Sequence, residues 1–204
     1  MTMLPNGSAL LRVAPLVCLL GTLAPTTAHG TTSRGLSLSE LVDGSDLVVR
    51  GVVREIEPGR DGGGRIQRRV TFEVEQYLIG EGPTTVLVKL LGGELEGAAT
   101  LVHGEAELTV GGREVLFLEL LRGGGAPVYG VTGMAQGRFA VARIDDTGVE
   151  LVSREIGRFA LPPLVEDGVD PAIGTAESCY CTTYARFAAL VRRAAGIDRV
   201  TAAE

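Results

Sequence analysis

Two cysteines near the C-terminal end have the most specific spacing for chemistry in this chain. Cys179 and Cys181 are separated by one residue, and Cys18 is the third cysteine of the 204 residues. In an exported protein, such a pair forms a local disulfide, two bridges to another chain, or two thiolate ligands for a soft metal. A C-x-C bridge closes a very small ring and is often strained and reducible, which permits a redox role. We expect a structural disulfide between Cys179 and Cys181, with metal or redox chemistry as the alternative.

His103 is the candidate general base, because the other histidine, His29, ends a segment that we expect to be removed. Nucleophilic catalysis needs a nucleophile beside a base that a third group orients, and no Gly-x-Ser-x-Gly elbow is present. A metal bound by Cys179 and Cys181 would need further ligands from His103 or from distant acids. We therefore predict no catalytic or cofactor-binding residue, no bound cofactor and no metal site, and these three residues are the remaining metal candidates.

Paired carboxylates could act as acid and base. The candidates are Glu73 with Glu75, Glu94 with Glu96, and Asp145 with Asp146. The first pair shares the outward face of a predicted strand, the second flanks glycines in a loop, and the third begins a turn, so we interpret all three as solvated surface. The glycine triplets 62–64 and 123–125 lack the residues of a P-loop or a dinucleotide fingerprint, and we interpret them as turns.

Most of the elements that would position these residues have the sequence pattern of β-strands. The 29 glycines and 9 prolines separate β-branched runs, which is typical of short strands joined by turns. Residues 45–57 predict a long first strand with one core face, whereas Arg50 and Arg54 fall on a second face that we interpret as solvated. Residues 65–79 return as its hairpin partner after a turn at 58–64.

Further strands and two helices follow from the same patterns. The nearly continuous apolar run of residues 84–91 predicts a central strand buried on both sides. Other strands are expected within or near residues 105–110, 114–121, 128–132, 137–144 and 149–153. Residues 94–112 form a long insertion of the kind that often carries function. Helices are expected at 37–43 and after Thr182 or Thr183, where the apolar positions recur at helical spacing.

The first thirty residues have the order of a secretory signal peptide. Arg12 precedes an apolar run at 13–24 and small residues at 25–30, and cleavage is expected after Ala28. The protein is therefore expected to be exported, periplasmic or extracellular, with no stable membrane anchor after cleavage. The predicted organisation is a signal peptide at 1–30, a β-barrel domain at 31–160, a linker at 161–178, and the Cys-x-Cys with an amphipathic helix at 179–204.

Charge and composition exclude some partners. The formal net charge is −6 and the acidic residues are scattered, which disfavours nucleic acid because phosphate binding needs a concentrated positive surface. Aromatic residues make up 4% and tryptophan is absent. This argues against aromatic-lined sites for carbohydrate or single-stranded nucleic acid.

The chain resembles a group of uncharacterised exported bacterial proteins over roughly residues 36–141. The likeness rests on Leu38–Val42, Ser45–Val53, Val70–Gly80, Gly92-Gly93 and Gly111–Leu118. More distantly it resembles netrin-like modules with an OB-type barrel, which include the tissue inhibitors of metalloproteinases. Those inhibitors chelate the target's zinc through a cysteine pair at the mature N-terminus, whereas here the pair lies at 179–181. The resemblance implies a small OB-like, netrin-like antiparallel barrel and no functional residue.

These observations predict a mainly β domain with a binding or interaction role and no enzymatic activity. Its partner would be another exported protein, and protease inhibition is one specific form of such a role. The alternative is an exported hydrolase, or a thiol-redox or metal-binding protein, that uses His103 or the Cys179/Cys181 pair.

Overall fold

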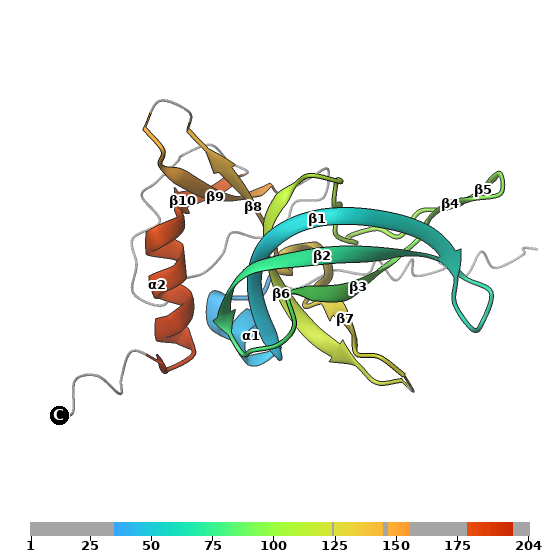
Figure 1. The fold of residues 1–204 in the computed structure, drawn as a ribbon, viewed down its shortest axis with the longest axis horizontal. Coiled ribbons are helices and arrows are strands. Elements are labelled where there is room, and N and C mark those ends of the chain that lie inside the picture. The colour runs from blue at the N-terminus through green and yellow to red at the C-terminus, as the bar shows by residue number, and fades with distance from the viewer. Residues whose placement is uncertain (1–34, 124, 145–146, 156–178, 198–204) are drawn as a thin grey trace, which may run out of the picture. The chain divides into compact units, whose positions relative to one another are not determined.

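The structure is a computed structural model, and it describes residues 35–123, 125–144, 147–155 and 179–197. This part of the chain is mainly β with two α-helices (Figure 1). The predicted signal peptide at 1–30, the predicted linker at 161–178 and the turn residues 145 and 146 lie outside the described residues. Of the helices in the described ranges, neither has the length and apolar character needed to cross a membrane.

The first helix confirms the prediction from its capping residues. α1 (Leu38–Asp43) begins after Ser37, whose Oγ accepts the backbone N–H of Glu40 at 3.2 Å. The Glu40 carboxylate in turn accepts the backbone N–H of Ser37 at 2.8 Å, which completes a capping box. The apolar side of α1 is buried and Gly44 ends the helix, as expected.

The predicted hairpin is present and longer than expected. β1 (Leu47–Arg60) and β2 (Ile66–Ile79) pair antiparallel along their whole length, and the turn is confined to residues 61–65 (Figure 1). The prediction of a turn from Pro58 was therefore wrong. In the described chain, β6 pairs with β1 only as far as Val52, so proline at position 58 meets an open edge where its missing N–H breaks no ladder.

The strand pairings that begin at β1 lead through β2, β3, β7 and β6 and back to β1. β2 pairs antiparallel with β3 (Thr85–Leu91), and β3 pairs in parallel with β7 (Val128–Val131). β7 pairs antiparallel with β6 (Arg113–Leu121), which pairs antiparallel with β1. β1 thus has β2 on one edge and β6 on the other.

The sheet continues beyond this cycle toward the C-terminus. η1 (Met134–Gly137) leads into β8 (Arg138–Arg143), which pairs with β6, and β9 (Glu150–Glu155) and β10 (Cys179–Thr183) follow in order. α2 (Tyr184–Ala194) begins directly after β10, and its cap is Thr183, as predicted. The predicted strands at 114–121, 128–132, 137–144 and 149–153 are all found within a few residues.

The buried apolar side chains form two cores. The first core lies inside the pairing cycle and comprises Leu47, Val49, Val53, Val70, Phe72, Val86, Val88, Leu90, Ala106, Leu108, Leu116, Leu118 and Val131. The second core lies between the helices and the β1–β6–β8–β9 strands and comprises Leu38, Leu41, Val42, Val48, Leu78, Val115, Phe117, Phe139, Val141, Val152, Phe187, Ala188 and Val191. Alternate residues of β1 and β6 belong to different cores, so these two strands are buried on both faces.

Two sequence-based assignments of burial were wrong for this reason. β1 was predicted to have one core face, yet six of its first seven residues are buried. β3 was predicted to be buried on both sides, yet its alternate residues are partly or fully exposed. The second core covers the outer face of β1 and leaves the outer face of β3 exposed. The helices determine which strand is covered, and their position cannot be predicted from the sequence of either strand.

The 94–112 insertion differs from its prediction. It begins with a hairpin of β4 (Gly93–Leu95) and β5 (Ala98–Thr100), and residues 105–110 form no strand. Ala106 and Leu108 are nevertheless buried in the first core. The carboxylate of Glu105 holds this segment by accepting the backbone N–H of Leu91 at 2.8 Å. Residues 105–110 are therefore held by tertiary contacts and not by the strand pairing that the sequence predicted.

Candidate functional site

The cysteine pair lies on an edge strand in the described chain. Cys179 and Cys181 are register partners of Glu155 and Ser153, which places both on one extended strand. Cys181 is half-buried and forms no disulfide, whereas the side chain of Cys179 lies outside the described part. The Cys179–Cys181 disulfide therefore stays a prediction. In an ideal extended strand residues two apart rise about 6.6 Å, whereas bridged Cβ atoms lie about 4 Å apart, so a bridge would require β10 to bend locally.

His103 lies exposed in the chain between β5 and β6. Within the described ranges, no three side chains among histidine, cysteine, aspartate and glutamate gather closely enough to hold a metal ion. The candidates His103 and Cys181 thus do not join a described ligand cluster. The prediction of no catalytic residue stays a prediction.

The expected solvated carboxylates behave differently from one another. Glu73 is half-exposed and binds the guanidinium of Arg54 at 2.7 Å, so the interpretation of Arg54 as solvated is confirmed. Glu94 and Glu96 are exposed on and beside β4. Asp145 and Asp146 lie outside the described residues. Glu75 is only 31% exposed, because it belongs to a charged cluster centred on Arg50.

Arg50 is not solvated, which corrects the sequence interpretation. Its side chain is 13% exposed and donates two hydrogen bonds to the Glu150 carboxylate, at 2.7 and 2.6 Å. Arg50 Nε also lies 3.2 Å from Glu75 Oε2, and Arg113 lies 3.3 Å from Glu75. We call Arg50, Glu75, Arg113 and Glu150 the Arg50 cluster. Its two positive and two negative charges balance, so it offers no free acid or base.

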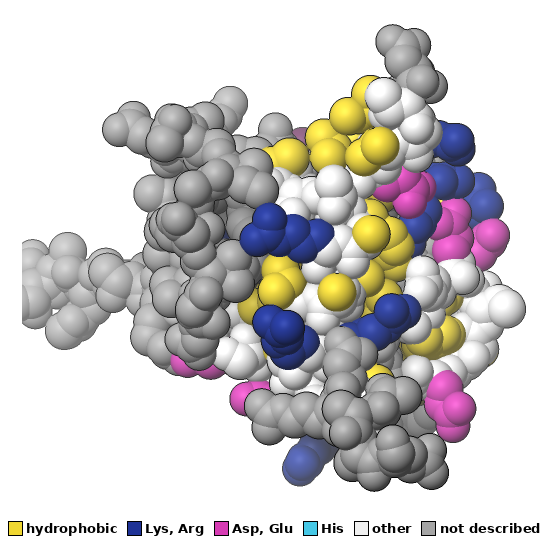
Figure 2. Space-filling view, turned by 90° about the vertical axis from the view of Figure 1, so that its left-hand side faces the viewer, with side chains coloured by type: hydrophobic (Ala, Val, Ile, Leu, Met, Phe, Trp, Pro, Cys, Tyr) yellow, Lys and Arg dark blue, Asp and Glu magenta, His cyan; other side chains and the backbone are white. Residues whose placement is uncertain are grey.

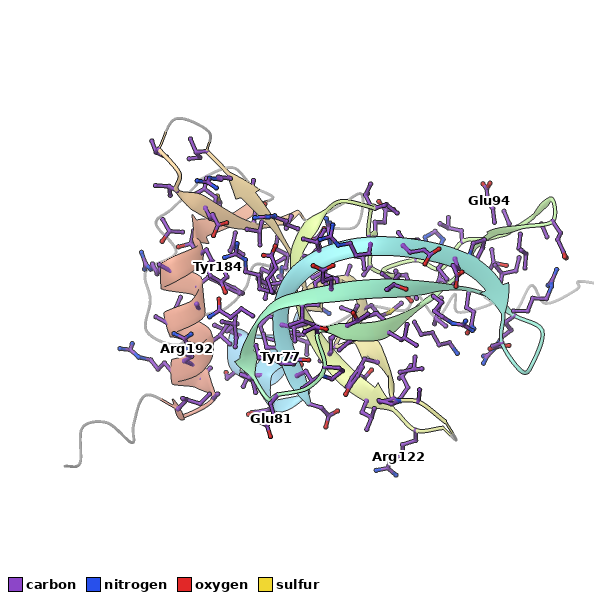
Figure 3. All side chains as sticks on the ribbon, in the orientation of Figure 1. Tyr77, Glu81, Glu94, Arg122, Tyr184 and Arg192 are labelled. Carbon is purple, nitrogen blue, oxygen red and sulfur yellow. The ribbon has the colours of Figure 1, made fainter. Side chains whose placement is uncertain are left out.

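Tyr184 connects this cluster to α2. The Arg50 guanidinium carbon lies 4.4 Å from the centre of the Tyr184 ring, and the Tyr184 hydroxyl donates to Gln76 Oε1 at 2.8 Å. Burial raises the pKa of Tyr184 above its ordinary value, although Arg50 partly opposes this shift. Tyr184 lies on the strand-facing side of α2 in Figure 3. The Arg50 cluster therefore joins the C-terminal helix to β1, β2 and β9.

A second ion pair is almost fully enclosed. The Glu114 side chain is 3% exposed and accepts two hydrogen bonds from Arg138, at 3.1 and 2.8 Å. Desolvation of the carboxylate raises the pKa of Glu114, and the Arg138 hydrogen bonds act against this shift. The pair lies where β6 meets β8. Both of its charges are engaged, so it serves as a structural contact.

The open site lies elsewhere, across the outer side of β2 and β3. A groove of about 650 Å³ is bounded by the β1–β2 turn and by the β6–β7 loop. Its described lining has five cations and one acid, with an apolar strip along the loop side. The cations are Arg60, Arg68, Arg69, Lys89 and Arg122, and we call this site the cationic groove. Figure 3 shows Arg122 extending from the β6–β7 loop away from the strands.

The cations of the groove are weakly paired. Arg60 approaches Glu96 at 3.4 Å, and Arg69 approaches Glu57 at 4.0 Å. Among the described residues, neither Lys89 nor Arg122 has a carboxylate oxygen within 4.0 Å. The positive charge of the groove is therefore largely uncompensated.

The single acid of the groove is held by its own turn. Asp61 accepts the backbone N–H groups of Arg65 and Gly63, both at 2.9 Å, and the Arg65 side chain at 2.8 Å. These bonds, the backbone bond from Arg65 foremost, hold the pKa of Asp61 below its ordinary value. Asp61 thus stays charged but is directed into the turn.

Two polar atoms in the groove wall are buried without a protein partner. Gln67 Oε1 and Arg68 Nε each lack a hydrogen bond to the described residues. Both atoms are shielded from solvent by the protein itself, so they belong to the packed wall and not to the open surface of the groove. Sequence reasoning missed this site, because its cations come from three strands and a loop and no local run contains them all.

The exposed side of α2 offers no comparable site. Arg186 and Arg193 are exposed there, whereas Phe187 and Val191 are buried. Figure 2 shows that side of the molecule, where the basic side chains near the middle of the view stand apart among apolar and neutral ones and those at the upper right adjoin acidic side chains. Comparisons with protein-family models, curated proteins and solved structures found no match for this chain. The candidate site therefore rests on the geometry of the cationic groove alone.

Proposed function

We propose that this protein is an exported binding domain that holds an anionic ligand in the cationic groove. The observation that carries the proposal is the gathering of five cations around one groove in a chain whose formal net charge is −6. Three of these cations, Arg68, Lys89 and Arg122, have no carboxylate oxygen within 4.0 Å among the described residues. Clustered cations raise the local concentration of anions and strengthen their binding.

The strand order supports an OB-like barrel as the scaffold of this site. Antiparallel pairs β1–β2, β2–β3, β7–β6 and β6–β1 combine with one parallel pair, β3–β7. OB-folds bind ligands on the face of their second and third strands, between the loops after the first and fourth strands. On such a scaffold the cationic groove, between the β1–β2 turn and the β6–β7 loop, would be the corresponding site. Export is proposed from the signal-like residues 1–30 and is tested by N-terminal sequencing of the protein recovered outside the cytoplasm.

Binding is tested with labelled poly-glutamate and a pair of charge reversals. Lys89→Glu combined with Arg122→Glu should weaken binding by at least about tenfold, because it places negative charge in the groove. The matched control is Arg186→Glu combined with Arg193→Glu on α2, which changes the net charge by the same amount. The control should leave affinity within about threefold of the unmodified protein. Equal losses in both variants, or no binding of any acidic polymer by the unmodified protein, would refute the proposal.

A further inference from the structure

We infer that the ligand of the cationic groove is an extended acidic polypeptide segment that also carries aliphatic side chains, supplied by a protein partner. This inference rests on the proposed function and specifies its ligand class. Two features of the groove carry it: a strip of aliphatic side chains beside the cations, and the lack of aromatic rings in the described lining.

The apolar strip lies beside the cations. Leu120, Leu121, Pro127 and Val128 line the loop side of the groove, and Leu120 is 47% exposed. A purely anionic polymer would contact the exposed leucine with little gain in binding free energy. Such a contact becomes favourable when apolar surface of both the leucine and the ligand is buried. A ligand that covers the strip must therefore have apolar groups of its own. Polyphosphate and sulfated glycans lack them.

The chemistry of the lining also discriminates against nucleic acid and favours carboxylates. No aromatic residue occurs in the described lining of the groove, so unpaired bases would have no ring on which to stack. Four of the five cations are arginines, whose planar guanidinium groups bind carboxylates through two parallel hydrogen bonds. The groove volume of about 650 Å³ suits a short peptide segment.

Four probes of matched charge separate this inference from the proposed function. They are a labelled peptide of alternating glutamate and leucine, poly-glutamate, polyphosphate and single-stranded DNA. We expect the glutamate–leucine peptide to bind at least about tenfold more tightly than the other three probes at one salt concentration. Leu120→Ser should weaken that peptide by about fivefold and leave poly-glutamate binding unchanged.

The matched control is Leu101→Ser, which changes a leucine that is 78% exposed and does not line the groove. It should leave every affinity unchanged. If polyphosphate or DNA binds as tightly as the peptide, and the Lys89→Glu/Arg122→Glu variant weakens both, the anionic site stands and the polypeptide inference falls. The inference also falls if Leu120→Ser and Leu101→Ser have the same effect on the peptide. If none of the four probes binds, the proposed function falls as well.

Discussion

Arg50 on β1 and Glu150 on β9 lie 100 positions apart in the sequence and are joined by two hydrogen bonds of 2.7 and 2.6 Å. β9 also pairs with β10, and α2 follows β10 directly. The Arg50–Glu150 contact therefore connects the C-terminal elements to the β1–β2 hairpin. Arg50 stacks at the same time on Tyr184 of α2. One side chain thus joins three separate segments of the chain.

Arg50→Ala should therefore lower the free energy of unfolding by about 2 kcal/mol, because it leaves Glu150 and Glu75 without their main partner in a partly enclosed position. Urea unfolding followed by circular dichroism measures the change. Arg54→Ala is the matched control, since Arg54 lies four residues away on β1 and its ion pair with Glu73 is half-exposed. Arg54→Ala should lower the free energy of unfolding much less than Arg50→Ala does, because a half-exposed ion pair contributes little. Equal effects of the two substitutions would show that Arg50 is no anchor.

Gly51 sets the close approach of β1 to β2. A Cβ atom at this position would lie 2.0 Å from the Glu73 carbonyl oxygen and 2.8 Å from a ring carbon of Phe72. Gly51→Ala should therefore lower the free energy of unfolding by about 2 kcal/mol or more, because backbone must move to admit the methyl group. Thermal unfolding and the refolding yield check this expectation.

Gly59→Ala provides the control on the same strand, because no atom outside its immediate neighbours lies within 4 Å of a Cβ there. Its melting temperature should stay the same or rise slightly, since alanine restricts the unfolded chain more than glycine does. A Gly51→Ala variant as stable as Gly59→Ala would contradict the close packing described here.

The sequence predicts local structure well and long-range contacts poorly. The Ser37 cap, the alternation in residues 66–79 and the Thr183 cap are local signals, and each element forms where they indicate. The burial of Arg50 depends on Glu150 and Tyr184, which lie far along the chain. The cationic groove likewise combines cations from three strands and a loop. Neither could be predicted without the strand order.

The cysteine pair offers a test of the extended geometry of β10. Because the strand separates Cys179 and Cys181 by more than a disulfide spans, we expect both thiols to accept an alkylating reagent without prior reduction. Trypsin releases one peptide with both residues, between Arg158 and Arg186, and its mass reports the number of alkyl groups. A peptide that is two hydrogens lighter and carries no alkyl group would establish the disulfide predicted from the sequence and require β10 to bend.

Glu114 predicts an unusual direction of pH dependence. Burial raises its folded-state pKa, so the folded protein binds this proton more tightly than the unfolded chain does. The resulting stabilisation is fully present below the unfolded-state pKa and is lost as pH rises through the folded-state pKa. The unmodified protein should therefore gain stability relative to Glu114→Gln when the pH falls from about 7 to about 4.

Glu73→Gln is the control of opposite sign. The Arg54 hydrogen bond lowers the pKa of Glu73, so its contribution to stability is present above the unfolded-state pKa and is lost as pH falls through the folded-state pKa. Acidification should thus reduce the difference in the free energy of unfolding between the unmodified protein and Glu73→Gln. Urea unfolding at a series of pH values measures both differences. If the stability of the unmodified protein relative to Glu114→Gln instead falls on acidification, as expected for Glu73→Gln, then Arg138 outweighs burial. The Glu114 carboxylate is then stabilised as an ion. In that case the enclosed pair at the meeting of β6 and β8 would strengthen as pH rises through the acidic range.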